Sequence, residues 1–127
     1  MAGGIDPWGS GSVKDYAKLE KEFGIEDFAR ITPKLEDPML LMRRGVVFGH
    51  RDFGRIAEAM KKREKFVMLT GLMPSGKFHL GHRMVADEII YLQQHGAKVY
   101  LLVADIEAYN MRGKSLEELR KLSLIHI

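Results

Sequence analysis

The sequence contains no cysteine, no long run of apolar residues and no large excess of charge of one sign. The absence of cysteine excludes disulfides and thiolate metal sites and is compatible with a reducing compartment. Because there is neither a long apolar run nor a charged-then-apolar leader, we expect a cytoplasmic chain that does not span a membrane. A net charge of +3 permits an RNA partner without requiring one.

The length and the composition of the chain predict one domain at most. The 127 residues have a hydrophobic fraction of 46%, which is ordinary for a globular protein. We divide them into a flexible leader rich in Gly and Ser, an N-terminal helical segment with a short strand, the first half of an α/β catalytic domain and an abrupt tail: 1–12, 13–65, 66–122 and 123–127. The tail is apolar and has no cap, so we expect a truncated chain whose last five residues need not be native.

The N-terminal segment carries several local signals. Val13 to Phe23 has the spacing of an amphipathic helix, and Val46 to Phe48 is a candidate strand. Asp52 is a candidate N-cap for the next helix, and His50 alone is interpreted as a structural or capping histidine. That helix ends in a basic run at 61–65, which favours a solvated helix end.

The central stretch changes its period from that of a strand to that of a helix. Phe66 to Thr70 is a continuous apolar run, which predicts a strand buried on both faces. From about Phe78 the helical period begins, and Gly96 is expected to end the helix. One side of this helix is expected to be apolar and the other polar: Leu80, Met84, Val85, Ile89 and Leu92 against Asp87, Glu88, Gln93 and Gln94.

The predicted strand, glycine-containing loop and helix form an arrangement that is suited to phosphate binding. The first amides of a helix lack partners within it and lie at the positive end of its dipole. Gly71, Gly76 and Gly81 allow a ligand to approach the backbone closely. His79 and His82 are three residues apart, so both side chains can leave one edge of the first turn.

Two phosphate-loop patterns compete for this stretch. Gly71, Gly76 and Lys77 fit G-x-x-x-x-G-K-[ST] except at the last position, where Phe78 lacks the hydroxyl that a magnesium ion needs. Pro74 also removes an amide from such a cradle. The pattern P-S-G-x-x-H-x-G-H is complete, at Pro74, Ser75, Gly76, His79, Gly81 and His82. It resembles the HIGH motif of class I aminoacyl-tRNA synthetases, which related nucleotidyltransferases also carry.

A second apolar run, Lys98 to Ala104, completes a strand–helix–strand unit, which predicts a parallel pair. Ligands of such sheets bind beyond the carboxyl ends of the strands. If the chain stays extended after this run, Asp105, Glu107 and Tyr109 share a face, where the carboxylates either hold an ammonium or a metal ion or serve as caps and turn residues. Ser115 and Glu118 form a capping box that starts a further helix.

Several blocks together resemble the tryptophanyl-tRNA synthetases of archaeal and eukaryotic type. They are Ile5-Asp6-Pro7-Trp8, Asp15-Tyr16-x-Lys18-Leu19, Phe23-Gly24, Arg43-Arg44-Gly45-x-x-Phe48-x-His50-Arg51-Asp52-Phe53 and the motif from Pro74 to His82. The resemblance implies a Rossmann-type parallel sheet, of which this chain holds the HIGH-motif half. Tyrosyl-tRNA synthetases share the histidine loop but have a shorter lead into the first strand, so they are the alternative.

The resemblance implies an ATP-dependent ligase that joins tryptophan to tRNA(Trp) through an adenylate, with Mg²⁺ accompanying ATP and no metal site in the protein. It assigns catalysis to His79 and His82, and ATP binding to Pro74, Ser75, Gly76, Gly81 and the two histidines. Glu107 falls where eukaryotic members contact tryptophan. Their pocket tyrosine, glutamine and threonine are replaced here by Leu69, Leu102 and Ala104, however. The family's full-length members are expected to be homodimers.

The second phosphate motif of the family, Lys-Met-Ser-Lys-Ser, does not occur in the sequence. We therefore expect the chain to be inactive alone, and to be partly unfolded or prone to aggregation, because a half-sheet buries little apolar surface. Two other classes stay open: a nucleotidyltransferase with the same loop, and a binding module without catalysis.

Overall fold

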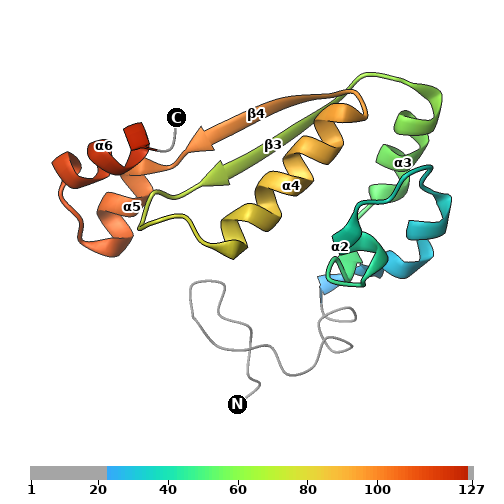
Figure 1. Ribbon diagram of the computed structural model, residues 1–127, viewed down its shortest axis with the longest axis horizontal. Helices are drawn as coiled ribbons and strands as arrows, with labels where there is room; N and C mark the ends of the chain where they lie inside the picture. Colours follow the sequence, from blue (N-terminus) through green and yellow to red (C-terminus); the bar gives the residue numbers. More distant parts are fainter. Residues whose placement is uncertain (1–22, 126–127) are drawn as a thin grey trace, which may run out of the picture. The chain divides into compact units, whose positions relative to one another are not determined.

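The computed structural model describes residues 23–125, which form parts of two compact units, Met1–Arg55 and Ile56–Ile127 (Figure 1). The amphipathic helix expected from Val13 lies outside the described residues, apart from its last residue, Phe23. The domain boundaries expected at 12, 65 and 122 stay predictions. Within the described residues, no helix is both long and apolar enough to cross a membrane.

The first unit is built from short elements. Strand β1 (Glu26–Asp27) pairs antiparallel with β2 (Gly49–His50). Between them lie two 3-10 helices, η1 (Phe28–Arg30) and η2 (Thr32–Lys34), and one helical turn, α2 (Leu40–Arg43). Helix α3 (Phe53–Lys62) begins at the end of this unit. Asp27 caps η1, because its carboxylate accepts a hydrogen bond of 2.8 Å from the N–H of Ala29.

Phe28 is the centre of the first unit's core. Its side chain is 2% exposed, and its backbone N–H donates to the carbonyl of Phe48 over 2.9 Å. The ring meets His50 edge to face, with centroids 5.7 Å apart, and Phe53 at 5.1 Å. Ile31, Leu35 and Met42 complete the buried set. A small aromatic cluster therefore holds short elements that could not stand alone.

The strand expected at Val46 to Phe48 is wrong. Both valine amides donate to the carbonyl of Leu41, over 2.9 and 3.4 Å, so they close the end of α2 instead of joining a ladder. Gly45 permits this reversal with a φ of 68°. The actual strand, β2, begins one residue after the expected one ends.

The capping role expected for His50 is confirmed, and the one expected for Asp52 is not. The N–H of Phe53, the first residue of α3, donates to Nδ1 of His50 over 3.4 Å. Asp52 has a φ of 56°, in the left-handed region that aspartate tolerates. It contributes its backbone carbonyl, which accepts from the N–H of Arg55.

The second unit contains the expected strand–helix–strand arrangement. Strand β3 (Phe66–Leu72) is followed by helix α4 (Leu80–Gln94) and strand β4 (Ala97–Val103). The strands are parallel in a register from Phe66 opposite Ala97 to Leu72 opposite Val103. The N–H of Ala104 adds a bond of 2.9 Å to the carbonyl of Leu72, so the ladder reaches the carboxyl end of both strands. Gly96, with a φ of 101°, makes the turn between α4 and β4.

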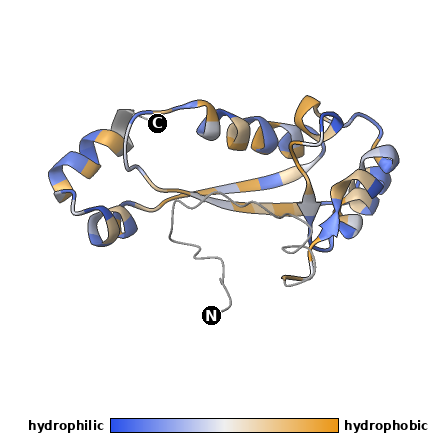
Figure 2. Ribbon diagram, turned by 90° about the horizontal axis from the view of Figure 1, so that it is seen from below, coloured by the Kyte–Doolittle hydropathy of each residue, from blue (hydrophilic) through white to orange (hydrophobic). Residues whose placement is uncertain are grey.

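The expectation that β3 is buried on both faces is wrong. Alternate residues of β3 are exposed, with Val67 at 61% and Leu69 at 75%, and on β4 Leu102 is 62% exposed. Helix α4 lies along one side of the two strands (Figures 1 and 2). Among the described residues of this unit, no second layer covers the other side of the strands. The continuous apolar run of β3 is typical of a strand buried on both faces, but only one face of it is packed.

The buried residues of α4 lie near its carboxyl-terminal end. Tyr91 and Leu92 are buried, whereas Leu80, in the first turn, is 83% exposed. Glu88, expected on the polar side, is partly buried, and this burial raises the pKa of its carboxyl above the ordinary 4.5. The helix meets the sheet mainly through its carboxyl-terminal half, so its first turn stands clear of the core.

The segment after β4 is helical, not extended. Helix α5 (Asp105–Arg112) begins directly after Ala104 and ends at Gly113, which has a φ of 62°. Helix α6 (Leu116–Ile125) follows and packs on α5, with Leu119 1% exposed (Figure 1). The capping box expected at its start is confirmed: the N–H of Glu118 donates to Oγ of Ser115 over 3.2 Å, and the N–H of Ser115 donates to the Glu118 carboxylate over 3.1 Å.

Candidate active site

The loop between β3 and α4 is anchored by a buried proline. Pro74 is less than 2% exposed, which is unusual for a loop residue, and the N–H of Ser75 turns back to the carbonyl of Met73 over 2.8 Å. Ser75 and Gly76 are partly exposed, and Lys77 is exposed. Pro74 therefore fixes the path of the loop, while the residues after it remain accessible.

Both motif histidines are bonded to the backbone of the turn that they open. His79 is the N-cap of α4, and its Nδ1 accepts from the N–H of Gly81 over 3.2 Å. His82 reaches back, and its Nδ1 accepts from the N–H of His79 over 3.2 Å. This is a capping box in which two imidazoles replace the usual hydroxyl and carboxylate.

The two rings are also in contact with each other. Their centroids are 3.9 Å apart with an angle of 45° between the ring planes. Phe78 also contacts the ring of His82, with centroids 4.9 Å apart. Sequence reasoning considered Phe78 only as the residue that lacks a hydroxyl, and missed this contact. The signal for it was the aromatic residue four positions before a histidine at the start of a helix.

Gly81 makes room for the ring of His79. A Cβ placed at Gly81 would lie 3.1 Å from both Cε1 and Nδ1 of that ring, closer than ordinary van der Waals contact. Any larger residue would therefore push His79 away from the amide that it caps. By contrast, a Cβ at Gly76 would meet nothing within 4 Å.

The carboxyl ends of the two strands bring a second set of residues toward this loop. Ala104, which bonds to the end of β3, is followed immediately by α5 and its acidic first turn. Asp105 accepts from the N–H of Ile106 over 2.8 Å, and Asp105 and Glu107 are both exposed. Because the segment is helical, Glu107 and Asp105 do not share a face, and the expected row of Asp105, Glu107 and Tyr109 is not formed.

Two of the three replaced pocket positions, Leu69 and Leu102, lie on the open face of the sheet. Leu69 is opposite Tyr100 in the register and Leu102 is opposite Gly71, so all four belong to the same alternating set. This set is exposed and mainly apolar, and it adjoins the carboxyl ends of both strands. A flat apolar ligand could lie on it without leaving a polar group unpaired.

No metal site accompanies these residues. Within the part of the chain that the structure describes, no three His, Asp or Glu side chains gather in a way that could hold an ion.

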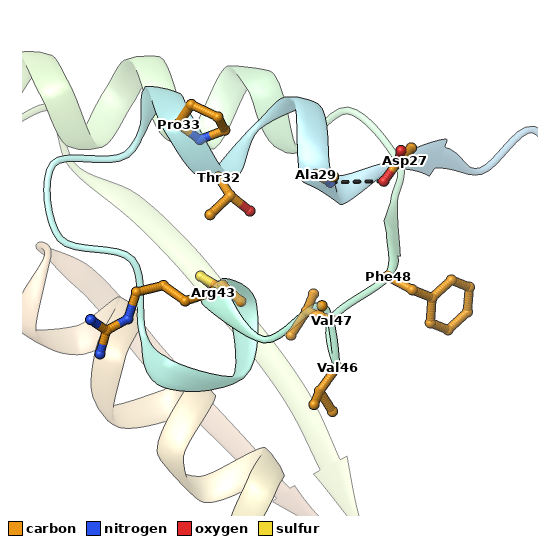
Figure 3. Close-up of a pocket in the computed structure, with 10 residues that line it drawn as sticks. Asp27, Ala29, Thr32, Pro33, Arg43, Val46, Val47 and Phe48 are labelled. Carbon is orange, nitrogen blue, oxygen red and sulfur yellow. Dashed lines mark hydrogen bonds between the residues drawn. The ribbon is translucent and has the colours of Figure 1, made fainter.

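The first unit has a cavity of its own, of about 770 Å³. It lies between the η1–η2 segment and the chain from α2 to β2 (Figure 3), and its walls are mainly apolar: Asp27, Ala29, Thr32, Pro33, Met42, Arg43, Gly45, Val46, Val47 and Phe48. The guanidinium of Arg43 and the ring of Phe48 extend away from this space, and the Asp27 carboxylate is bonded to Ala29. The cavity offers few converging polar groups.

Known proteins are similar to this chain in sequence. A family model described as class I tRNA synthetases (W and Y) matches residues 60–124. The tryptophan–tRNA ligase of Archaeoglobus fulgidus is 46% identical over 97% of this chain, and that of Aeropyrum pernix is 46% identical over 94% of it. The chain spans about a third of the length of these relatives, 29% and 33% respectively.

Solved structures of tryptophanyl-tRNA synthetases are also similar to this chain. The crystal structure of the Aeropyrum pernix tryptophanyl-tRNA synthetase matches with a TM-score of 0.75 and covers 94% of this chain, which in turn covers 34% of that one. The crystal structure of the Plasmodium falciparum tryptophanyl-tRNA synthetase, 28% identical, matches with a TM-score of 0.71. The match covers 86% of this chain and 32% of the Plasmodium chain. The shared fold is the mixed helix and strand arrangement of the class I synthetases. The family match covers just over half of the sequence and contains the complete histidine loop, so this chain belongs to the class I tRNA synthetases of the tryptophan and tyrosine group.

Proposed function

We propose that the chain is the part of a tryptophan–tRNA ligase that handles the phosphates of ATP. The observation that carries this proposal is the pair of imidazoles at the start of α4, reached by a loop from the carboxyl end of β3. That edge of a parallel sheet is where ligands of such folds bind. The similarity to tryptophan enzymes over more than nine tenths of the chain supports the choice of amino acid.

The proposed reaction has two steps. A carboxylate oxygen of tryptophan attacks the α-phosphorus of ATP, the bond from that phosphorus to the bridging oxygen breaks, and pyrophosphate leaves. A hydroxyl of the terminal adenosine of tRNA then attacks the carbonyl of the adenylate, and AMP leaves. Neither step requires a nucleophile from the protein, so its contribution is positioning and the stabilisation of phosphate charge.

We assign roles to the loop residues on this basis. His79 and His82 are the proposed catalytic residues, because imidazole N–H groups can stabilise charge on the phosphates. Pro74, Ser75, Gly76 and Gly81 are proposed to shape the ATP site. Pro74 does so by anchoring the loop, and Gly81 by making room for the His79 ring.

The amino-acid side is proposed to use the open face of β3 and β4. Leu69 and Leu102 are exposed there and are suited to an indole ring. Glu107 is proposed to contact the tryptophan from the first turn of α5, where it is exposed. Residues 66–122 are accordingly proposed as the first half of the catalytic domain.

The remaining partners belong to the whole protein. We propose tRNA(Trp) as the acceptor, Mg²⁺ as an ion that arrives with ATP, a homodimer as the assembled form and the cytoplasm as the location. We propose that the contacts with the acceptor arm of the tRNA, and the second phosphate motif, belong to segments of the whole protein outside these 127 residues.

The test is ATP–pyrophosphate exchange with a chimera. The chain replaces the matching third of the Aeropyrum pernix enzyme, to which it is 46% identical. We expect exchange that depends on tryptophan, and a loss of about 100-fold or more when His82→Ala is introduced. ATP binding by the unjoined chain, followed calorimetrically, provides a second reading if the chimera does not fold. Absence of exchange in a folded chimera, with no ATP binding by the chain, would contradict the proposal.

Two other readings are separated by the same assay. The family description includes tyrosine enzymes, and tyrosine in place of tryptophan as the stimulating amino acid would favour that alternative. Exchange stimulated by neither amino acid, with ATP still bound, would favour a nucleotidyltransferase of another specificity.

A further inference from the structure

The second unit carries a cluster of positive charge to which no role has been assigned. Five exposed side chains form it, and we call them the basic cluster: Lys61, Lys62, Arg63, Lys65 and Lys98. Glu64 is the one acidic residue among them in the sequence. Five cations and one anion leave four positive charges, against a net charge of +3 for all 127 residues. The basic cluster therefore accounts for the whole positive excess of the chain.

The pairing of the two strands brings Lys65 and Lys98 together. Val67 lies opposite Lys98 in the register. Both lysines line one recess of about 450 Å³, with these residues around it: Lys65, Phe66, Val67, Gly96, Ala97 and Lys98. This recess is at the amino ends of β3 and β4, whereas the histidine loop leaves the carboxyl end of β3 (Figure 1). Because a strand rises about 3.3 Å per residue, strands of 7 residues separate the two ends by about 20 Å.

No acidic partner neutralises the basic cluster. The ion pairs of the described residues lie elsewhere, on α4 and α6. The ammonium of Lys98 lies 5.1 Å from the centroid of the Tyr100 ring, a contact that orients the side chain and leaves its charge uncompensated. Lys61 and Lys62 are in the last turn of α3, where the helix dipole favours cations, but the other three members lie outside the helices. The dipole therefore explains only two of the five cations.

Arg63 occupies a kind of position in which this chain otherwise has glycine. It follows α3 with a φ of 55°, in the left-handed region, and its N–H donates to the carbonyl of Met60 over 3.1 Å. After α2, α4 and α5 the chain enters the same region at Gly45, Gly96 and Gly113. Arginine has a conformational cost there that glycine does not have. The local fold therefore favours glycine and does not account for a cation at this turn.

We propose that the basic cluster binds the sugar–phosphate backbone of an RNA, at the end of the sheet opposite the histidine loop. Exposed cations without acidic neighbours suit a polyanion, whose binding releases counterions. Lysines predominate in the cluster, and a lysine holds phosphate as a point charge without reading the bases. A contact about 20 Å from the histidine loop would orient an RNA without touching the reacting atoms. The choice of RNA among polyanions rests on the proposed function, which brings tRNA to this protein.

Binding of a tRNA(Trp) transcript to the chimera, measured at several salt concentrations, tests the proposal. The test variant combines Lys65→Gln with Lys98→Gln. The matched control combines Arg30→Gln with Lys34→Gln, which removes the same charge from exposed side chains of the first unit. We expect the test variant to bind about 10-fold more weakly, and its slope of log affinity against log salt to fall by about 1 to 2. The control should change neither quantity, and both variants should keep ATP–pyrophosphate exchange, which does not involve tRNA.

Arg63→Gly separates a binding role from a structural one. Glycine relieves the left-handed backbone, so the melting temperature of the chimera should stay the same or rise. Affinity for the transcript should nevertheless fall, with the salt slope lower by about 1. A variant that melts at the same or a higher temperature and binds the transcript as tightly as before would show that Arg63 is only a solvated helix end.

Equal affinities and equal salt slopes in the test and control variants would overturn the proposal. Polyglutamate is the second probe: if its binding depends on Lys65 and Lys98 while binding of the transcript does not, the partner is an acidic protein segment, and the assignment to RNA is wrong. Failure of the proposed function gives a different result, because the unsubstituted chimera then shows no exchange that depends on tryptophan. If only the inference is wrong, that exchange is present and transcript binding is indifferent to the basic cluster.

Discussion

The amide of His79 donates to Nδ1 of His82 over 3.2 Å, and the two rings lie with their centroids 3.9 Å apart. This relationship makes the two histidines of the motif one unit. Each ring is held by the backbone beside the other, so their geometry is set before any ligand arrives. Preorganised donors of this kind stabilise developing charge without reorganising during the reaction.

Gly81→Ala is expected to weaken this unit. The new Cβ would lie 3.1 Å from Nδ1 of His79, so the ring has to move and the cap on the helix is strained. We expect a loss of up to about 1 kcal/mol in the free energy of unfolding, measured by denaturant titration. Gly54→Ala in α3 is the matched control: its Cβ would meet Ile31 at an ordinary 3.9 Å, so it should stabilise by up to about 1 kcal/mol. Equal changes in the two variants would contradict the steric argument.

Phe28→Ala is expected to unfold the first unit. Phe28 is 2% exposed and contacts the rings of His50 and Phe53, so its removal leaves a cavity among elements that have little other support. The expected cost is about 3 kcal/mol or more, visible as lost hydrogen-exchange protection in residues 26–50. Phe23→Ala, at a position 42% exposed, should cost far less. Retained protection in the Phe28 variant would show that the core lies elsewhere.

Glu88→Gln is expected to raise the melting temperature at neutral pH. Burial raises the pKa of the Glu88 carboxyl above the ordinary 4.5, so the folded state binds a proton more readily than the unfolded state does. The penalty is absent below 4.5, appears as pH rises through the folded pKa and is complete above it. The gain from the substitution should vanish in acid.

The neighbouring Asp87→Asn serves as the control for Glu88→Gln. It breaks an exposed ion pair with Arg83 of 2.8 Å, and should lower stability by about 0.3 kcal/mol at neutral pH. If Glu88→Gln lowered the melting temperature at neutral pH as much as Asp87→Asn does, the Glu88 carboxylate would be making a favourable contact. Its burial would then not be destabilising.

The start of α6 is expected to fray in acid. Hydrogen bonds from the backbone of Ser115 lower the pKa of Glu118, with help from the charge of Lys114. A lowered pKa means that the stabilisation is present above the ordinary 4.5 and is lost as pH falls through the folded value. Amide exchange in residues 116–119 should therefore accelerate in acid beyond the intrinsic trend. Glu118→Gln should abolish this pH dependence, because it removes the titrating carboxylate that accepts from the N–H of Ser115; an unchanged dependence would exclude the capping box as its cause.

Sequence patterns predicted the central unit well because its signals are local. The apolar run at Phe66, the helical period from Phe78 and the stop at Gly96 each belong to one element, and the parallel pairing follows from the connection. The capping box at Ser115 was predicted for the same reason: two side chains three residues apart satisfy each other's backbone.

The errors arose where distant residues decide. Val46 and Val47 have strand propensity, but the carbonyl of Leu41 takes their amides. The polar pattern after β4 suits an extended segment as well as a helix, and packing of α5 on α6 selects the helix. Glu88 was placed on the polar side because its side chain is charged, although it lies four residues from both Met84 and Leu92 and therefore on their side of the helix.

The candidate site could be found from the sequence, but not its internal bonding. The spacing of His79 and His82 predicted that both rings leave one edge of a turn. It did not predict that their Nδ1 atoms accept the amides that a phosphate would otherwise use, because histidine is not a usual capping residue. The contact of Phe78 with His82 was likewise visible only in the structure.

Titration of the chain with ATP, followed through the ring nitrogens of its histidines, tests the central claim most directly. The account predicts that the ring signals of His79 and His82 shift as ATP is added, while the signals of His95 stay in place. ATP that binds without moving the ring signals of either His79 or His82 would contradict it.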